Sequence, residues 1–313
     1  MRAVQYSEYG DADVLHVVDD APEPHPGPGQ VRIRVKAAGV TPADWYLRSG
    51  SLQQIAPLQL PHIPGVDAAG IVDEIGEDTN DVRIGDEVFG LTPPAQSGGA
   101  FAEFAILDAW ASKPARVSWE EVGGLAANVE TATRALDELA VRAGMTVLVE
   151  GASGGVGTIL IQLAHARGAR VVGTASSANH ALLRSLGAEA TTYGEGLVER
   201  VRTLAPEGVD VAIDSAGAGS LPRLIEITGA PDHVLTLADF SAAEYGVRLS
   251  TSAGPGADGQ DGRDGLTIAS ELLDKRELTV PIHAVYPHGR AADAHRESET
   301  RRARGKIIVT FFS

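Results

Sequence analysis

A glycine-rich turn between a strand and a helix constrains the fold of this chain most. The apolar run Thr146–Glu150 has the pattern of a strand, and Gly151-Ala152-Ser153-Gly154-Gly155-Val156-Gly157 follows it directly. The next apolar residues recur at helical spacing and form one stripe, at Val156, Ile159, Leu160, Leu163 and Ala164. From Ala152 the turn matches G-x-G-x-x-G with alanine in the first place. Its strand–turn–helix context predicts a dinucleotide-binding site.

Each glycine of this turn has a physical role in such a site. Gly154 lets a pyrophosphate approach the backbone, and Gly157 lets the helix pack closely on the strand. The helix N-terminus then offers N–H groups and a positive dipole to the anion. The alternative is a tight strand-to-helix turn without a ligand.

The segment after the second strand predicts which dinucleotide binds. A site for NAD usually has an acidic residue about 20 residues after the glycine turn, where it holds the ribose 2′-hydroxyl. Residues 173–184 contain no Asp or Glu, whereas Ser176 and Ser177 can donate to a 2′-phosphate. His180 or Arg184 can add positive charge. We therefore expect NADP(H). The same segment also suits capping of the next helix by Ser177 or Asn179.

The pattern of strands and helices changes near residue 120. Before it, short alternating runs separated by Gly and Pro predict a β-rich domain, with strands at 31–35, 71–75 and 87–89. After it, strands alternate with helices, which predicts a parallel sheet covered by helices on both faces. The strands expected there are 146–150, 170–174, 209–213 and 233–237, with a helix at 179–186 and a last strand at 305–312. Residues 252–265 are rich in Gly, Asp, Ser and Pro and are expected to form a mobile surface loop.

Charge and cysteine content exclude several classes of function. The 26 Lys and Arg against 42 Asp and Glu give a net charge of −16, so we expect neither nucleic acid nor an anionic membrane as a partner. The absence of cysteine excludes disulfides, thiolate catalysis and cysteine-ligated zinc. No apolar run approaches the roughly 18 to 20 residues of a membrane span, and the start lacks the pattern of a secretory signal. A cytoplasmic protein is the expectation.

Several motifs along the whole chain carry a family resemblance. They are Ala38-Gly39-Val40-Thr41-Pro42-Ala43-Asp44-Trp45-Tyr46-Leu47-Arg48-Ser49-Gly50, Pro64-Gly65-Val66-Asp67-Ala68-Ala69-Gly70, Gly85-Asp86-Glu87-Val88-Phe89-Gly90, Gly98-Gly99-Ala100-Phe101-Ala102-Glu103, Ala152 to Gly157 with Gln162, and Arg304-Gly305-Lys306. Together they resemble the medium-chain dehydrogenase/reductase superfamily, and within it the zinc-independent quinone oxidoreductase (zeta-crystallin-like) branch.

The resemblance implies an α/β architecture of two domains. A GroES-like catalytic β domain would comprise residues 1–118 and 266–313. A Rossmann domain with a doubly wound parallel sheet, residues 119–265, would bind NADP(H). The active site would lie in the cleft between the domains, and the protein would be a homodimer.

The resemblance also implies that no metal takes part. Zinc-dependent alcohol dehydrogenases of the superfamily bind zinc through Cys and a Gly-His-Glu motif, whereas this chain has Thr41 and Val66-Asp67 at those positions. His62 lies nearby in sequence, but a lone histidine is more often structural. Without zinc to stabilise an alkoxide, a quinone or an α,β-unsaturated carbonyl is the expected substrate, because conjugation spreads the charge. Hydride from NADPH would reach the β-carbon, and hydrogen-bond donors would hold the enolate oxygen.

The family match indicates three candidate catalytic residues. Tyr46 occupies the place of a tyrosine that lines the active site of quinone reductases, where it would orient the substrate or donate a proton; the alternative is a packed or surface aromatic side chain. Asp44 is a further candidate that would orient its neighbours or pair with Arg48. Thr41 replaces the asparagine expected at its position, so it keeps a hydroxyl but loses an amide donor.

Cofactor contacts follow from the same motifs. Thr131 would lie beside the nicotinamide, and His180 stands where a lysine is frequent in the family. Arg304 and Lys306 would reach the cofactor, or remain solvated surface charges. The other expected contacts are Ser153, Gly154, Gly155 and Val156 at the pyrophosphate, Ser176 at the 2′-phosphate, Tyr193 near the adenosine, and Ser215, Leu237 and Ala238 at strand ends.

Three functions are compatible with these residues. The first is an NADPH-dependent quinone or enone reductase. The second is an enoyl reductase of specialised metabolism, which uses the same chemistry. The third is a non-catalytic NADPH-binding protein, which binds the cofactor but oxidises it with no acceptor.

Overall fold

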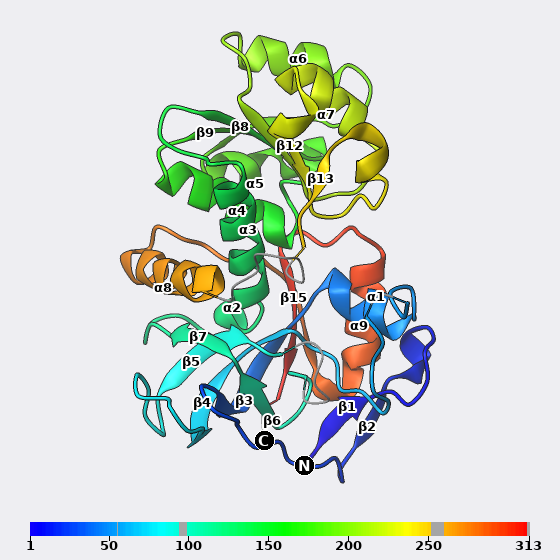
Figure 1. The fold of residues 1–313 in the computed structure, drawn as a ribbon, viewed down its shortest axis with the longest axis vertical. Helices are drawn as coiled ribbons and strands as arrows, with labels where there is room; N and C mark the ends of the chain where they lie inside the picture. Colours follow the sequence, from blue (N-terminus) through cyan, green and yellow to red (C-terminus); the bar gives the residue numbers. More distant parts are fainter. Residues whose placement is uncertain (55, 94–98, 252–259, 312–313) are drawn as a thin grey trace. The chain divides into compact units, whose positions relative to one another are not determined.

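The computed structural model describes residues 1–54, 56–93, 99–251 and 260–311. The chain divides into two compact units (Figure 1). Unit 1 comprises Met1–Ala127, Arg263–Arg276 and Val280–Ser313, and unit 2 comprises Asn128–Gly262 and Glu277–Thr279. No helix among the described residues is long and apolar enough to cross a lipid bilayer.

A seven-stranded sheet forms the centre of unit 1, in the order β14-β15-β3-β4-β5-β7. Its long strand β3 pairs with β4 on one side and with both β6 and β15 on the other. Among the described strands of this sheet, the β14–β15 pair is parallel and the other pairs are antiparallel. The strands of unit 1 are β1 (Ala3–Gln5), β2 (His16–Val18), β3 (Val31–Val40), β4 (Asp67–Ile75), β5 (Glu87–Leu91), β6 (Phe104–Leu107), β7 (Ala109–Ser112), β14 (Ile282–Pro287) and β15 (Lys306–Thr310).

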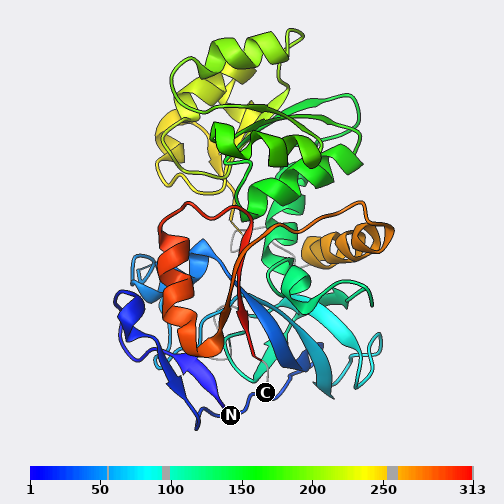
Figure 2. The ribbon, with the colours of Figure 1, turned by 180° about the vertical axis from the view of Figure 1, so that it is seen from behind.

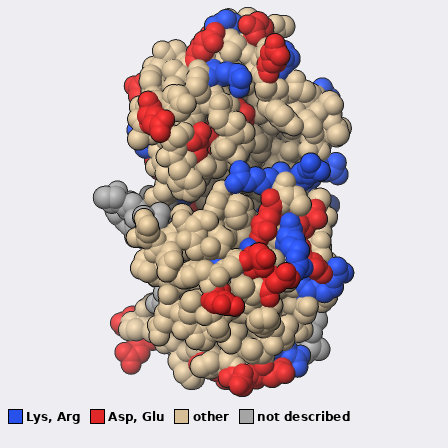
Figure 3. All heavy atoms as spheres, turned by 90° about the vertical axis from the view of Figure 1, so that its right-hand side faces the viewer, with Lys and Arg blue, Asp and Glu red and all other residues tan. Residues whose placement is uncertain are grey.

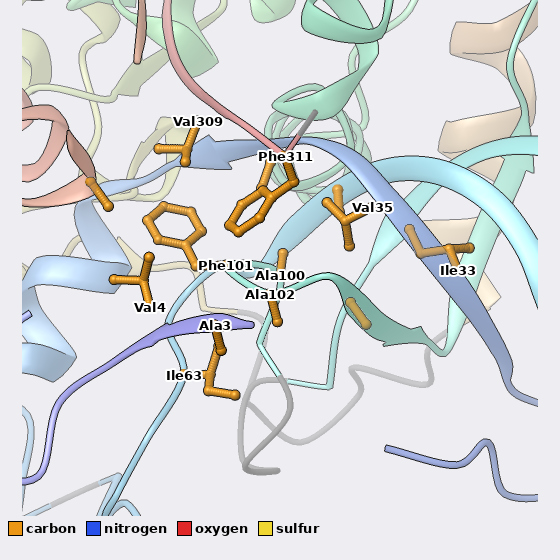
Figure 4. Packing of buried hydrophobic residues seen from close by; sticks show 14 of the residues in the cluster. Ala3, Val4, Ile33, Val35, Ile63, Ala100, Phe101, Ala102, Val309 and Phe311 are labelled. Carbon is orange, nitrogen blue, oxygen red and sulfur yellow. The ribbon is translucent and has the colours of Figure 1, made fainter. Parts of the chain in front are cut away.

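Alternation along β3 explains the core of unit 1. Val31, Ile33 and Val35 are buried at every second position, as a strand with one face on a core requires. Figure 4 shows Ile33 and Val35 on the long strand and Phe101, Val309 and Phe311 around the same core. Residues far apart in sequence therefore close one hydrophobic core. The strands predicted at 31–35, 71–75 and 87–89 are confirmed within β3, β4 and β5.

Helices α1 and α9 lie side by side in unit 1, as both views show (Figures 1 and 2). The helices of this unit are α1 (Pro42–Arg48), α2 (Trp119–Gly123), α8 (Gln260–Lys275) and α9 (Ala291–Glu299), with 3-10 turns η1 (Ala12–Val14) and η5 (His288–Arg290).

The loop expected over residues 252–265 is corrected in part. Residues 252–259 lie outside the described part of the chain, and residues 260–265 belong to helix α8. The helix forms because Leu266, Ala269 and Leu273 recur at helical spacing and are buried. This apolar stripe overrides the weak helix propensity of the Gly- and Asp-rich segment before it.

A six-stranded parallel sheet forms the centre of unit 2, in the order β10-β9-β8-β11-β12-β13. This order is that of a doubly wound fold, with the switch point beside β8. The strands are β8 (Thr146–Glu150), β9 (Arg170–Thr174), β10 (Ala188–Thr191), β11 (Val211–Asp214), β12 (Val234–Thr236) and β13 (Arg248–Leu249). The parallel sheet expected after residue 120 is confirmed, and β8 and β9 have the predicted bounds.

The helices of unit 2 bury the faces of this sheet. Leu148 and Val172 share a buried cluster with Leu197 and Val201 of α6 and Leu224 of α7. Helix α4 packs on β8 and β9, and its buried residues from Ile159 to Ala164 are apolar except for Gln162. The helices are α3 (Ala126–Glu138, which starts in unit 1), α4 (Gly155–Ala166), α5 (His180–Ser185), α6 (Leu197–Leu204) and α7 (Leu221–Thr228), with 3-10 turns η2 (Ser177–Asn179), η3 (Pro231–His233) and η4 (Ala242–Tyr245).

Candidate functional site

The glycines of the turn between β8 and α4 differ in their roles. Some are required by close packing or by the backbone conformation, whereas one leaves open space beside the backbone. A Cβ on Gly157 would lie 2.4 Å from the carbonyl oxygen of Gly151, which no side chain tolerates. Gly151 has a φ of +74°, in the left-handed region that favours glycine. A Cβ on Gly154 would meet only the oxygen of Gly151, at 3.4 Å. Gly157 therefore serves the fold, whereas Gly154 keeps one side of the turn open.

The residues of this turn fit a pyrophosphate. Helix α4 begins at Gly155 with Gly154 as its N-cap, and glycine has no side chain to satisfy the first N–H groups. These donors and the helix dipole suit an anion. Ser153 accepts a hydrogen bond from Nδ2 of Asn179 at 3.2 Å, which ties the turn to the segment after β9. The predicted contacts Ser153, Gly154, Gly155 and Val156 are thus adjacent at one helix end.

The segment after β9 presents the residues expected at a 2′-phosphate. Ser176 is exposed and precedes the 3-10 turn η2. His180 donates from Nε2 to the carbonyl oxygen of Ala175 at 3.3 Å, because a carbonyl can only accept. This bond leaves Nδ1 as the second polar atom of the ring. Tyr193 follows β10 and is 58% exposed.

The ends of β11 and β12 carry the remaining predicted contacts of unit 2. Ser215 donates from both Oγ and its backbone N–H to the oxygen of Glu150, at 2.7 and 3.1 Å. Leu237 follows β12, and its N–H donates to the oxygen of Asp214 at 2.8 Å; Ala238 comes next. The carboxyl ends of parallel strands meet at one edge, so these residues share the edge with the glycine turn. Thr131, on α3, donates to Glu130 at 3.1 Å.

Two buried carboxyl groups at this edge were missed in the sequence analysis. Burial, with a smaller effect of the nearby Asp214, raises the pKa of Glu150 to about 7, against the lowering effects of Ser220 and Arg223. Oε2 of Glu150 makes no hydrogen bond among the described residues. Asp214 accepts from the N–H groups of Ala216 and Gly217 and from Oγ1 of Thr236. An acidic residue at the end of an apolar strand was the available signal for both.

Thr41 and Asp44 form one buried cluster in unit 1. Oδ2 of Asp44 accepts from the N–H of Thr41 at 2.7 Å and from its hydroxyl at 2.9 Å. Oδ1 accepts from the N–H of Gly65 at 2.9 Å. Burial raises the pKa of Asp44 to about 6, against the lowering effect of these hydrogen bonds. The carboxylate therefore fixes the start of α1 to the Pro64-Gly65 turn and sets the position of the Thr41 hydroxyl.

Tyr46 lies in an aromatic and basic cluster on α1. Its hydroxyl accepts a hydrogen bond from Nη2 of Arg301 at 2.6 Å. The rings of Trp45 and Tyr46 have centroids 3.9 Å apart, and the Arg301 guanidinium lies 5.5 Å from the Trp45 ring. Arg301 follows Tyr46 by 255 positions, and no sequence pattern links the two residues.

Lys306 and Asp67 lie on the two sides of Gly39. A Cβ on Gly39 would be 2.4 Å from Oδ1 of Asp67 and 3.1 Å from Nζ of Lys306. Lys306 is buried and donates to the oxygen of Val40 at 3.3 Å. Burial raises the pKa of Asp67, and the Lys306 charge opposes this effect. Lys306 is therefore not the solvated surface charge that was its alternative.

The last candidate residue of unit 1 is Arg304, and the last question is whether this unit holds a metal site. Arg304 is exposed, and its N–H donates to Nδ1 of His283 at 3.3 Å. The family resemblance places Thr41 near the position of the zinc-binding Cys and Val66-Asp67 at that of the His-Glu pair. Within the described ranges, no three His, Asp or Glu side chains come together as metal ligands. The expected absence of metal stays a prediction.

Comparison with known proteins gives the family. Residues 27–116 match the model of the alcohol dehydrogenase GroES-like domain, and residues 155–235 match that of the zinc-binding dehydrogenase. The NADPH-dependent alkenal/one oxidoreductase of Arabidopsis thaliana chloroplasts is 32% identical over 99% of this chain and 79% of its own length. The quinone oxidoreductase of Sus scrofa is 31% identical over 99% of this chain and 97% of its own length.

Solved structures confirm the fold class. A mycobacterial protein solved in complex with NADPH matches with a TM-score of 0.81 and 28% identity, over 99% of this chain and 100% of that one. The expected GroES-like domain and Rossmann-like parallel sheet are confirmed. The chain belongs to the medium-chain dehydrogenase/reductase superfamily, in its quinone oxidoreductase and alkenal/one oxidoreductase branch.

Proposed function

We propose that this protein is a zinc-independent oxidoreductase that uses NADPH to reduce a quinone or an α,β-unsaturated carbonyl. The similarity to quinone oxidoreductase over 99% of the chain carries the proposal. The open glycine turn at the N-terminus of α4 supports it, because this turn fits a pyrophosphate.

The residues of unit 2 that would hold NADPH follow from their positions. The N–H groups at the start of α4, beside Ser153, would bind the pyrophosphate. Ser176 and Nδ1 of His180 would meet the 2′-phosphate, since no carboxylate within residues 173–184 would repel it. Thr131, Tyr193, Ser215, Leu237 and Ala238 would line the rest of the cofactor, as the family motifs indicate.

The donors of unit 1 would act on the acceptor. When bound, NADPH supplies a hydride. Its addition at the β-carbon of a conjugated carbonyl leaves negative charge on the carbonyl oxygen, and hydrogen-bond donors stabilise that charge. Tyr46 carries a hydroxyl whose oxygen accepts from Arg301, and this contact would hold the phenol in place as a proton donor.

Thr41 and Asp44 would have different roles. The Thr41 hydroxyl would contact the acceptor or the nicotinamide, because it replaces the family's asparagine. Asp44 is a positioning residue, since all three of its hydrogen bonds go to Thr41 and Gly65. Lys306 would contribute its positive charge to the site, where it lies next to the carboxylate of Asp67 and lowers the pKa of that group.

Finer assignments rest on the resemblance. The reaction class would be the reduction of quinones or of the carbon–carbon double bond of enones with NADPH. The protein would be a cytoplasmic homodimer. Light scattering after size-exclusion chromatography tests its oligomeric state.

Steady-state oxidation of NADPH, followed at 340 nm, tests the function. The panel contains a 1,4-naphthoquinone, a linear enone and a saturated aldehyde, with NADH in parallel. Turnover of the quinone or the enone with a preference for NADPH is the expected result. Turnover confined to the aldehyde would refute the conjugated-acceptor proposal. Binding of NADPH without any turnover would contradict it for this panel and leave an enoyl reductase of specialised metabolism or a non-catalytic NADPH-binding protein.

A matched pair of variants tests Tyr46. Tyr46→Phe removes the phenol oxygen and is expected to lower kcat about 100-fold, in the range of a lost general acid. Tyr245→Phe makes the same change at a 41%-exposed tyrosine of unit 2 and should leave kcat unchanged. Equal kcat values in both variants would remove Tyr46 from the mechanism.

A further inference from the structure

A basic segment connects α9 to β15. Residues 300–305, called the arginine arm below, contain Arg301, Arg302 and Arg304, all exposed. Figure 3 shows a row of Lys and Arg side chains on one face, with Asp and Glu side chains next to them, on a chain whose net charge is −16. Such a concentration of positive charge on an acidic protein creates a local field that attracts anions.

The acidic side chains next to the arm are paired elsewhere. Glu297 accepts from Nε2 of His283 at 2.9 Å, and Glu299 forms an ion pair with the buried Arg48. Among the described residues, no carboxylate forms an ion pair with an arginine of the arm. The positive charge of the arm is therefore not neutralised within the part of unit 1 that the structure describes.

The backbone of the arm is held at both ends. The N–H of Arg301 donates to the oxygen of Ser298 at 3.0 Å, and the N–H of Arg304 donates to His283 at 3.3 Å. Arg301 has a φ of 55°, which is uncommon for a residue with a long side chain. Its side chain reaches Tyr46 on α1.

Arg301 and Trp45 present donors in the same cluster. Nη2 of Arg301 donates to the hydroxyl oxygen of Tyr46 at 2.6 Å. A guanidinium has five N–H donors in a planar fork. Nε1 of Trp45 is a buried donor without a hydrogen-bond partner among the described residues. The exposed guanidinium of Arg301, 5.5 Å from the Trp45 ring and beside Tyr46, has the planar fork of N–H donors that binds a carboxylate or a phosphate.

We propose that Arg301, backed by Trp45, binds an anionic group of the acceptor, so that the preferred acceptor is a conjugated carbonyl bearing a carboxylate or phosphate. This inference rests on the proposed function, in which Tyr46 contacts the acceptor. The phosphates of NADPH are the other source of the same chemistry, and the test separates the two.

The test compares an acid with its ester. The acceptors are trans-4-oxopent-2-enoate and its methyl ester, which share one enone and differ in charge. The measured quantity is the ratio of kcat/KM for the acid to kcat/KM for the ester, at saturating NADPH. Comparison of this ratio between variants cancels the different intrinsic reactivities of acid and ester.

The variants are Arg301→Gln and a matched control, Arg276→Gln. Arg276 is an exposed arginine of unit 1 with a φ of 62°, so both variants make the same change of charge in the same backbone conformation. Arg301→Gln is expected to lower the acid-to-ester ratio about tenfold, with KM for NADPH unchanged. Arg276→Gln should leave the ratio as in the wild type. Added salt should reduce the wild-type ratio, since the contact is exposed.

Three results would overturn the inference. If Arg301→Gln leaves the ratio unchanged while both acceptors are reduced, Arg301 does not bind the acceptor, and the proposed function stands. If KM for NADPH rises instead and the ratio stays constant, the arm binds the cofactor. If the wild type reduces no quinone and no enone, the proposed function fails, and this inference fails with it.

Discussion

His295 on α9 offers a test of how burial controls charge in unit 1. The side chain is fully buried, both ring nitrogens lack hydrogen-bond partners among the described residues, and the ring meets Phe101 edge-on at 5.6 Å. Burial, with a smaller effect of Arg48, lowers its pKa from 6.5 to about 3. In the unfolded chain the ring takes up a proton near pH 6.5, whereas the folded protein keeps it neutral to about pH 3.

The sign of the pH dependence follows from proton uptake. Stability rises with pH wherever the unfolded state binds more protons, so His295 destabilises the fold as the pH is lowered from 6.5 to about 3. The slope approaches 1.4 kcal/mol per pH unit, and between pH 7 and pH 5 the loss amounts to about 2 kcal/mol. Asp44 and Glu150 act in the opposite direction, because burial raises their pKa to about 6 and about 7. The pH dependence of the total free energy of unfolding therefore combines these contributions. The contribution of His295 is obtained from the difference between the wild type and a variant that lacks this histidine.

Urea unfolding of His295→Leu at pH 7 and pH 5 isolates this histidine. The free energy of unfolding of the variant, relative to the wild type, should rise by about 2 kcal/mol from pH 7 to pH 5. His16→Leu, at an exposed histidine, is the control and should show no such rise. A change below about 0.5 kcal/mol for His295→Leu would refute the account of a neutral buried ring.

Three further predictions concern the glycine turn, the cofactor and the Thr41 cluster. Gly157→Ala should lower the free energy of unfolding by about 2 kcal/mol, because its Cβ would lie 2.4 Å from a backbone oxygen. Gly154→Ala should leave stability unchanged and weaken NADPH binding about tenfold, as measured by fluorescence titration. Ser176→Glu should reverse the ratio of kcat/KM for NADPH to that for NADH, and an unchanged ratio would mean that the 2′-phosphate binds elsewhere. Asp44→Asn should cost about 2 kcal/mol in urea unfolding, because a carboxamide nitrogen cannot accept the hydrogen bonds of Thr41 or Gly65; stability equal to the wild type would contradict this role.

Unit 2 was predictable because its signals are local. Each strand of the parallel sheet is a short apolar run followed by a helix with its own stripe, so β8 and β9 were expected at the residues where they occur. The need for glycine at Gly157 also follows from local geometry, since the helix must pass close to the backbone of Gly151. Residues 260–265 were misjudged because the stripe that makes them helical starts after them, at Leu266.

Unit 1 was less predictable because its pairing is not local. β15 joins β3 across more than half of the chain, and only the family resemblance implied that the C-terminal residues complete this domain. Separation in sequence also decides which contacts of the candidate site could be predicted. Thr41 and Asp44 are three positions apart and were proposed together, whereas the contact of Arg301 with Tyr46 spans 255 positions and has no pattern in the sequence.

The position of hydride addition tests the central claim most directly. An enone is reduced with NADPH that carries deuterium at the transferred position of carbon 4, and the product is analysed by NMR. The proposed function predicts deuterium on the β-carbon of a saturated ketone. Deuterium on the carbonyl carbon, in an allylic alcohol, would show direct carbonyl reduction and contradict the account.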